Sequence, residues 1–163
     1  MIEIREVTKK YGKFTAVDKL SMTVDKGSVY GLVGYNGAGK TTLLKTVAGI
    51  YRADGGSVTV DGVDVFDSAD VKRRMFYVPD DLYFNYNSSI EKMAKFYAGY
   101  YPKFSFETLD KLCGVFKLDK TARINSFSKG MQRQAAMILG MSTLPEILLL
   151  DESFDGLPPR EAL

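Results

Sequence analysis

Residues 34–41 gather in one short stretch the residue types that bind phosphate. Gly34, Gly37 and Gly39 lead directly into Lys40 and Thr41, in the pattern G-x-x-x-x-G-K-[ST]. Glycines let successive backbone N–H groups curl around an anion, whereas a Cβ would obstruct that path. The lysine adds a full positive charge, and the threonine hydroxyl can bind Mg²⁺ beside the phosphates. The stretch predicts a site for a nucleoside triphosphate, the alternative being a plain glycine-rich turn.

Two carboxylates follow an apolar run near the other end of the chain. Residues 147–150 are apolar, and Asp151 and Glu152 come directly after them. A parallel strand beside the phosphate loop would bring Asp151 near Mg²⁺, held through the water shell of the metal, and Glu152 near the γ-phosphate. Glu152 would then act as general base toward the attacking water. An acidic strand end alone is often only a solvated cap, but together with residues 34–41 it predicts hydrolysis.

The composition is that of a small globular protein and excludes several kinds of chemistry. The 163 residues are 45% hydrophobic and 26% charged, which allows one domain or one domain with a small insert. The sequence has no histidine, which excludes a Ser-His-Asp triad, a Cys–His pair and a histidine metal site within this chain. Its single cysteine, Cys113, excludes an internal disulfide.

Charge and hydropathy also limit the partners. The net charge of +2 gives no argument for nucleic-acid binding, so no nucleic acid is expected as a partner. The charged, alternating start of the chain is unlike a signal peptide, and the longest apolar runs are only a few residues long. Any membrane role would therefore come through a partner.

The phosphate-binding stretch needs a strand before it and a helix after it. Residues 29–33 are apolar without alternation, which predicts a strand buried on both faces, as in a parallel sheet. An amphipathic helix is expected after Gly39. The first 25 residues predict antiparallel strands, and residues 57–60 and 63–66 predict a hairpin.

Residues 81–125 have a different character and predict a helical insert between two parts of an α/β core. Ser88-Ser89-Ile90-Glu91 offers a capping box for one helix, and a second helix is expected after Ser105. The insert lies between a short strand, residues 75–78, and a second fully buried strand, residues 146–150. Ten of the 20 aromatic residues lie between residues 76 and 104; at least half are expected in the core of the insert and the rest on a docking surface.

Residues 127–134, with the sequence FSKGMQRQ, lie between the two chemical motifs. Ser128 would cap the following helix, so that its hydroxyl and the Gly130 N–H could meet an anion. By itself the stretch would also suit an ordinary capped helix. In this order and spacing it resembles the signature sequence of ABC ATPases, whose common form is Leu-Ser-Gly-Gly-Gln. Variants with Ser-Lys-Gly-Met occur in bacterial exporter subfamilies.

The resemblance covers the whole chain and implies the ATP-binding subunit of a bacterial, exporter-like ABC transporter. The implied fold is an α/β P-loop NTPase core of ABC type with an antiparallel β subdomain and an α-helical subdomain insert, the C-terminal part of the core missing. Residues 1–80 would form the β subdomain and P-loop core, and residues 81–125 the helical subdomain. Residues 126–163 would hold the signature helix, the Walker B strand and the subunit-contact loop, as an incomplete continuation of the core.

The resemblance also implies the roles of individual residues. Tyr11 is similar to the aromatic residue that these proteins stack against adenine, and Val17 to an apolar neighbour of the nucleotide. Mg²⁺ would be bound by Thr41, Asp80 and Asp151, with Glu152 as the catalytic base. The residues expected to bind ATP are Tyr11, Val17, Gly34, Asn36, Gly37, Ala38, Gly39, Lys40, Thr41, Thr42, Ser128 and Gly130.

Three departures from the family pattern affect these expectations. Asp80 stands where the family has a glutamine, and an ionised carboxylate cannot donate a hydrogen bond. Leu157-Pro158 replaces the usual Leu-Asp of the subunit-contact loop. The chain ends at Leu163, before the strand and γ-phosphate histidine of the family. We therefore expect it to be the N-terminal part of a longer subunit, and we expect hydrolysis to be impaired in the 163-residue chain alone.

The leading functional expectation is an ATPase that powers transport. In the family, two subunits sandwich two ATP molecules, and the closure and hydrolysis drive a membrane permease. The expected partners are therefore a second copy of the subunit and a permease, and the expected location is the cytoplasm, on the inner face of the bacterial cell membrane. Two alternatives stay open: a soluble ABC ATPase without a membrane partner, and a module that binds ATP without hydrolysing it.

Overall fold

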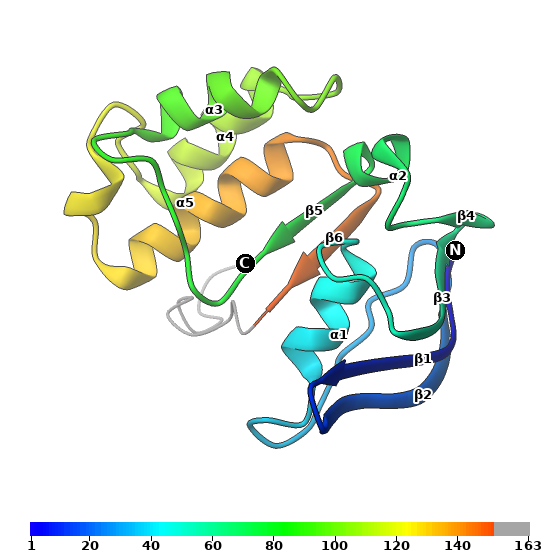
Figure 1. The fold of residues 1–163 in the computed structure, drawn as a ribbon. Helices are drawn as coiled ribbons and strands as arrows, with labels where there is room; N and C mark the ends of the chain where they lie inside the picture. Colours follow the sequence, from blue (N-terminus) through cyan, green and yellow to red (C-terminus); the bar gives the residue numbers. More distant parts are fainter. Residues whose placement is uncertain (152–163) are drawn as a thin grey trace. The chain divides into compact units, whose positions relative to one another are not determined.

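The computed structural model describes residues 1–151 and divides into two compact units. The first unit is formed by residues 1–72, and the second begins at residue 73. Each unit has its own sheet (Figure 1). No helix in the described part of the chain is long and apolar enough to cross a membrane.

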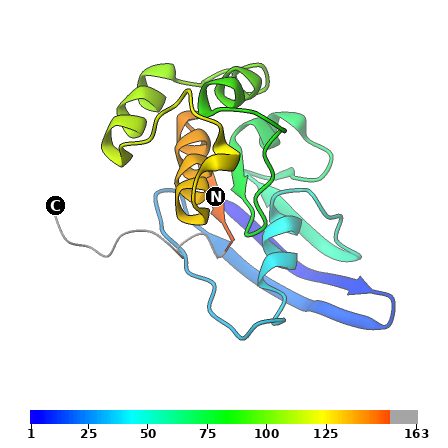
Figure 2. The ribbon, with the colours of Figure 1, turned by 90° about the vertical axis from the view of Figure 1, so that its left-hand side faces the viewer.

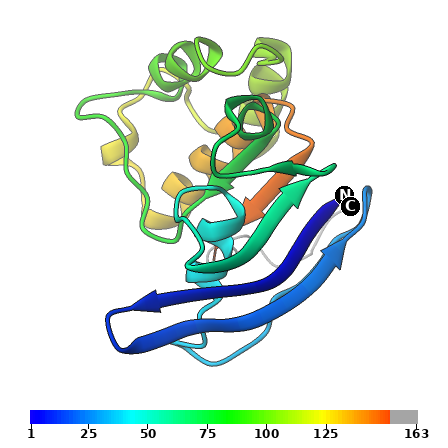
Figure 3. The same ribbon diagram turned by 45° about the vertical axis from the view of Figure 1, so that its right-hand side comes forward.

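The first unit is built on a four-stranded antiparallel sheet with the strand order β2-β1-β3-β4. The strands are β1 (Ile2–Tyr11), β2 (Phe14–Val24), β3 (Gly55–Val60) and β4 (Val63–Asp64). β1 and β2 form the long blue hairpin of Figure 3. Ile2 and Ile4 are buried and lie opposite Val60 and Val58, because alternate side chains of a strand share one face. The expected antiparallel strands and the hairpin are confirmed.

Two helices complete this part of the chain. Helix α1 (Lys40–Val47) begins directly after the glycine-rich loop and buries Leu43, Thr46 and Val47. The short helix α2 (Ala69–Arg73) follows β4 and buries Val71. The helix that the sequence predicts after Gly39 is therefore present.

The strand predicted at residues 29–33 is wrong. These residues form no regular structure, and the side chains of Val29 and Val33 are almost completely exposed. An apolar run indicates a preference for burial, but a strand also needs a neighbour to accept and donate its backbone hydrogen bonds. None of the strands within residues 1–151 pairs with this segment.

The second unit contains two parallel strands, β5 (Met75–Val78) and β6 (Ile147–Leu150). Their register pairs Met75 with Ile147 and Val78 with Leu150. The expectation that the second strand is fully buried is wrong, because Leu148 is 36% exposed. Within the described residues β6 pairs with β5 alone, so one of its edges lacks the cover that full burial requires.

Three helices of the second unit pack together, as Figure 2 shows. They are α3 (Ile90–Ala98), α4 (Phe106–Phe116) and α5 (Lys129–Ser142), and a 3₁₀ turn, η1 (Ile124–Ser126), precedes α5. The large, fully buried residues in the core of these helices are Ile90, Leu109, Ile124, Ile138 and Leu139.

Each of these helices begins with a serine cap. The side chains of Ser89, Ser105 and Ser128 accept hydrogen bonds from the backbone N–H three residues further on. This satisfies one of the N–H groups that a helix start leaves unpaired. The predicted capping box is corrected in one detail: Ser89 is the cap, and Glu91 pairs with Lys95 instead of reaching back.

The aromatic residues between 76 and 104 divide as expected between core and surface. Phe76 is buried and packs against Tyr97 and Tyr101, with ring centroids 5.3 and 5.7 Å away. Burial raises the pKa of both tyrosines. The exposed aromatic residues of this stretch are Tyr83, Tyr86, Phe96 and Tyr100.

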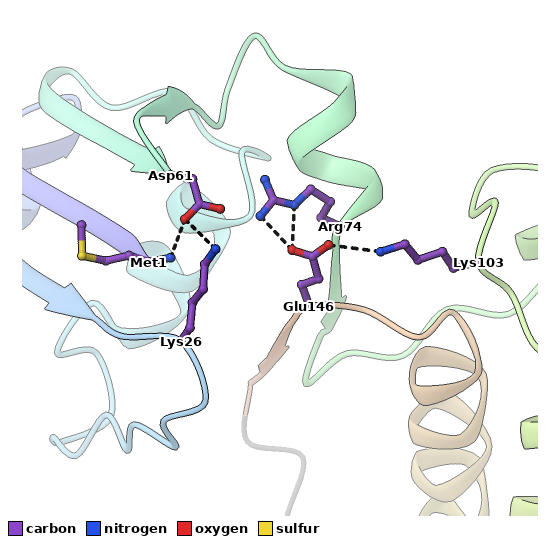
Figure 4. Close-up of polar contacts among 6 residues, drawn as sticks. All are labelled: Met1, Lys26, Asp61, Arg74, Lys103 and Glu146. Atoms are coloured by element: carbon purple, nitrogen blue, oxygen red, sulfur yellow. Dashed lines mark hydrogen bonds and ion pairs between the residues drawn. The ribbon is translucent and has the colours of Figure 1, made fainter.

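Each unit also contains a small network of ion pairs (Figure 4). In the first unit, Asp61 accepts from the Met1 amine at 2.8 Å and lies 3.2 Å from the Lys26 ammonium. In the second unit, Glu146 binds Arg74 at 2.8 Å and Lys103 at 3.2 Å. The second network joins the starts of β5 and β6 to the α3–α4 connection, and it holds the pKa of Glu146 below its ordinary value, mainly through the Arg74 hydrogen bond.

Candidate nucleotide-binding site

The glycine-rich loop reaches α1 through backbone that only glycine adopts readily. Gly37 and Gly39 have φ angles of 84° and 86°, in the left-handed region. A Cβ on Gly39 would lie 2.2 Å from the carbonyl oxygen of Ala16, so a larger residue does not fit there. The Gly39 carbonyl accepts the N–H of Leu43 at 2.8 Å, which begins the helix.

The Lys40 side chain folds back over this loop. Its ammonium donates to the carbonyl oxygens of Gly34 at 2.8 Å and Tyr35 at 3.1 Å. The loop also contains a tight turn in which the Ala38 N–H donates to Tyr35. The loop, the ammonium and the start of α1 thus provide backbone donors, a positive charge and a helix N-terminus in one place, the three features that bind phosphate groups.

Tyr11 and Val17 lie beside the loop within the same unit. The Tyr11 hydroxyl lies 3.5 Å from the Thr42 hydroxyl, and Tyr11 is 46% exposed. Val17 is buried, 3.5 Å from the position that a Cβ on Gly39 would take. The structure therefore brings together the predicted residues of the first unit, from Tyr11 to Thr42.

Two residues that sequence reasoning missed support Tyr11. The Tyr51 ring meets the Tyr11 ring edge-on, with centroids 6.3 Å apart. Asp54 accepts the backbone N–H of Lys10 at 2.6 Å, which fixes the chain next to Tyr11. This hydrogen bond, with Lys9 nearby, lowers the pKa of Asp54 and keeps it ionised.

In the second unit, Asp151 lies at the end of β6. Asp151 is 2% exposed, and its N–H continues the parallel ladder by donating to the Val78 carbonyl at 3.0 Å. The Tyr77 hydroxyl donates to Asp151 Oδ2 at 2.8 Å. Glu152, the predicted catalytic base, lies outside the described residues.

Asp80 follows β5 and forms an ion pair with α5. Its Oδ1 accepts from the Arg133 guanidinium at 2.9 Å, and Asp80 is half exposed. Asp80, which stands where the family has a glutamine, therefore has a partner of opposite charge. This partner, Arg133, lies one turn into α5, the helix that Ser128 caps. Metal binding by Asp80 stays a prediction, and it would compete with Arg133 for the carboxylate.

The predicted signature residues occupy the start of α5. Ser128 is exposed, and its hydroxyl accepts the Met131 N–H at 3.3 Å. Gln132, which sequence reasoning missed, donates from its side chain to the carbonyls of Ile124 and Phe127. These bonds hold the turn before the helix, so that the Ser128 cap and the first N–H groups of α5 have a fixed position.

The donor types available suit Mg²⁺ better than a softer metal. Magnesium prefers oxygen ligands, keeps several waters and is bound by one or two carboxylates together with phosphates. Asp151 supplies a buried carboxylate, and Thr41 a hydroxyl on the first turn of α1. No group of three histidine, cysteine or acidic side chains within residues 1–151 forms a site for a metal by itself. Magnesium binding by Thr41 and Asp151 stays a prediction.

Comparison with known proteins shows what the chain resembles. The family model described as "ABC transporter" matches residues 17–155. The ABC transporter ATP-binding protein YtrB of Bacillus subtilis is 31% identical over 157 residues, covering 96% of this chain and 54% of that protein. The chain thus spans about half the length of this curated relative.

Solved structures give the same fold. A structure described as the ATP binding subunit of an ABC transporter superimposes with a TM-score of 0.87 at 24% identity, over 97% of this chain and 68% of that one. A dimeric ATP-binding cassette bound to ADP and phosphate gives a TM-score of 0.83 at 20% identity, over 98% and 77%. The chain therefore belongs to the ABC transporter family and has the fold of its ATP-binding cassettes.

Proposed function

We propose that the chain is the ATP-binding and ATP-hydrolysing subunit of an ABC transporter, of the exporter type, and that it powers a separate membrane protein. The observation that carries this is the loop of residues 34–39 with Lys40 folded over it, at the start of α1. The buried Asp151 at the end of a parallel strand supports the same assignment.

In the proposed site, the N–H groups of the loop and the Lys40 ammonium bind the β- and γ-phosphates. Tyr11 stacks on the adenine, and Val17 packs beside the nucleotide. Thr41 and Asp151 would hold Mg²⁺, which would supply neutralisation of the charge on the phosphates. Glu152 takes the proton of the attacking water as a general base.

The second copy of the chain completes the proposed cycle. Ser128 and Gly130, at the start of α5, would face the γ-phosphate bound to the opposite subunit, because a helix N-terminus attracts anions. ATP would then favour the paired state, and hydrolysis would release it. The dimeric cassette bound to ADP and phosphate supports this arrangement by analogy of fold.

The proposed membrane partner would dock on the second unit. Tyr83, Tyr86, Phe96 and Tyr100 are exposed there, whereas their aromatic neighbours fill the core. Exposed aromatic side chains are typical of interaction surfaces. Through this partner the subunit would lie on the inner face of the bacterial cell membrane.

The assignment is tested by ATP binding in the complete protein that contains this sequence. Lys40→Ala removes the charge over the loop, and losing a hydrogen bond to a charged group costs about 1.5–3 kcal/mol. Calorimetry should therefore show a loss of about tenfold to hundredfold in Mg-ATP affinity. Lys111→Ala, an exposed lysine on α4, is the matched control and should bind like the parent. Parental affinity in Lys40→Ala would remove the loop from the site.

A further inference from the structure

The Asp151 carboxylate is buried and needs hydrogen-bond donors. Only 2% of the residue is exposed, and a carboxylate removed from water is costly unless its oxygens are satisfied. The Tyr77 hydroxyl supplies such a donor to Oδ2 at 2.8 Å. The backbone of Asp151 is fixed separately, by its N–H bond to Val78.

The register of the two parallel strands explains why Tyr77 reaches this oxygen. Tyr77 lies opposite Leu149, so the two side chains project from the same face of the sheet. Asp151 is two residues beyond Leu149 and shares that face. The tyrosine ring is long enough to span the offset, and phenylalanine would fill the same space without a hydroxyl.

We propose that Tyr77 is a positioning residue for metal binding: its hydroxyl holds one oxygen of the Asp151 carboxylate and thereby orients this group as a metal ligand. This inference rests on the proposed function. Hydrogen-bond partners that orient a ligand group typically change metal affinity by about tenfold to hundredfold when they are removed. In this proposal Tyr77 acts through Asp151.

The test uses Tyr77→Phe in the complete protein, with Mn²⁺ as the probe for the magnesium position. Electron paramagnetic resonance measures Mn²⁺ binding in the presence of a saturating, non-hydrolysable ATP analogue. Calorimetry with EDTA measures nucleotide binding without metal, and thermal unfolding checks the fold. We expect Mn²⁺ affinity to fall about tenfold to hundredfold, while metal-free nucleotide affinity and the unfolding temperature stay near parental values.

Two further variants separate the explanations. Tyr97→Phe removes a hydroxyl from another partly buried ring of the same unit and should leave Mn²⁺ binding unchanged. Asp151→Asn should weaken Mn²⁺ binding at least as much as Tyr77→Phe. If Asp151→Asn weakens Mn²⁺ binding and Tyr77→Phe does not, the positioning role is wrong and the proposed function stands.

Other outcomes are equally decisive. If Asp151→Asn binds Mn²⁺ as tightly as the parent, Asp151 is not a metal ligand. That part of the proposed function then fails together with the inference. If Tyr77→Phe loses heat stability and metal-free nucleotide binding in proportion to Mn²⁺ binding, the hydroxyl has a structural role only, which also overturns the proposal.

Discussion

At the scale of single residues, the phosphate loop depends on the backbone of Gly39. Its left-handed φ would cost a residue with a Cβ about 1–2 kcal/mol. The Cβ would also collide with the Ala16 carbonyl at 2.2 Å, which the backbone cannot avoid without moving β2. Gly39→Ala should therefore lower the free energy of unfolding in urea by more than the conformational cost alone.

Gly37 provides the matched control for this prediction. Its φ of 84° carries the same conformational cost, but nothing lies within 4 Å of the position of its Cβ. Gly37→Ala should therefore lose only about 1–2 kcal/mol of stability. If the two variants unfold at the same urea concentration, the contact with Ala16 has no energetic weight.

The sequence alone proposes those residues of the candidate site whose signal is local. Lys40, Thr41 and the glycines form a motif within eight positions. Ser128 can be recognised as a helix cap because it directly precedes a helix. Tyr77 and Arg133 were missed, because their roles depend on strand register and on a helix packed beside β5. The one signal for Tyr77 was a polar, hydroxyl-bearing residue within a short apolar strand.

At the scale of elements, α5 packs closely against β5, and the residue of α5 at this contact is Gly140. A Cβ on Gly140 would lie 2.6 Å from the ring of Phe76, which is itself buried against Tyr97 and Tyr101. Overpacking of this kind typically costs about 1–3 kcal/mol. Gly140→Ala should therefore destabilise the protein in urea, although alanine favours a helix.

For Gly114 on α4, we expect substitution by alanine to raise the stability instead of lowering it. It also lies in a helix, but nothing lies within 4 Å of its Cβ position. Gly114→Ala should gain up to about 1 kcal/mol from helix propensity. Equal effects of the two substitutions would mean that the Phe76 ring moves aside freely.

The Glu146 network makes the second unit sensitive to acid. Arg74 and Lys103 lower the pKa of Glu146 in the folded state, so the ionised form is favoured by folding. The contribution of these ion pairs to the free energy of unfolding is complete above the ordinary glutamate pKa of about 4.3 and is lost as the pH falls below it. Glu146→Gln should be less stable than the parent at neutral pH, and this difference should shrink toward pH 3 in thermal unfolding. A difference independent of pH would contradict the ion-pair explanation.

Elements were predicted well where local signals define them and poorly where partners do. The alternation of β1 and the serines before α3 and α4 are sufficient to place those elements. Residues 29–33 have the composition of a buried strand but no partner strand among the described residues, and Leu148 is exposed for a related reason. Pairing is a property of the sheet, and an apolar run does not encode it.

At the scale of the whole molecule, the proposed function requires two copies to meet through ATP. Each nucleotide would contact the loop of one copy and the start of α5 of the other. Hydrolysis removes the γ-phosphate, and with it the anion that the α5 N-terminus would attract. Glu152→Gln, made in the complete protein, should retain ATP affinity but lose about 10²–10⁴-fold in turnover. It should therefore accumulate as an ATP-bound dimer.

Light scattering after size-exclusion chromatography measures this directly. Glu152→Gln should double its mass with Mg-ATP and stay monomeric with ADP. Adding Ser128→Glu, which sets a negative charge against the phosphate of the partner copy, should abolish the dimer without changing ATP binding by the monomer. Ser126→Glu, an exposed serine in the turn before α5, should leave the dimer intact. A dimer that forms equally well with both glutamate substitutions would show that the start of α5 does not face the nucleotide, because a charge at its cap would then have no anion to repel.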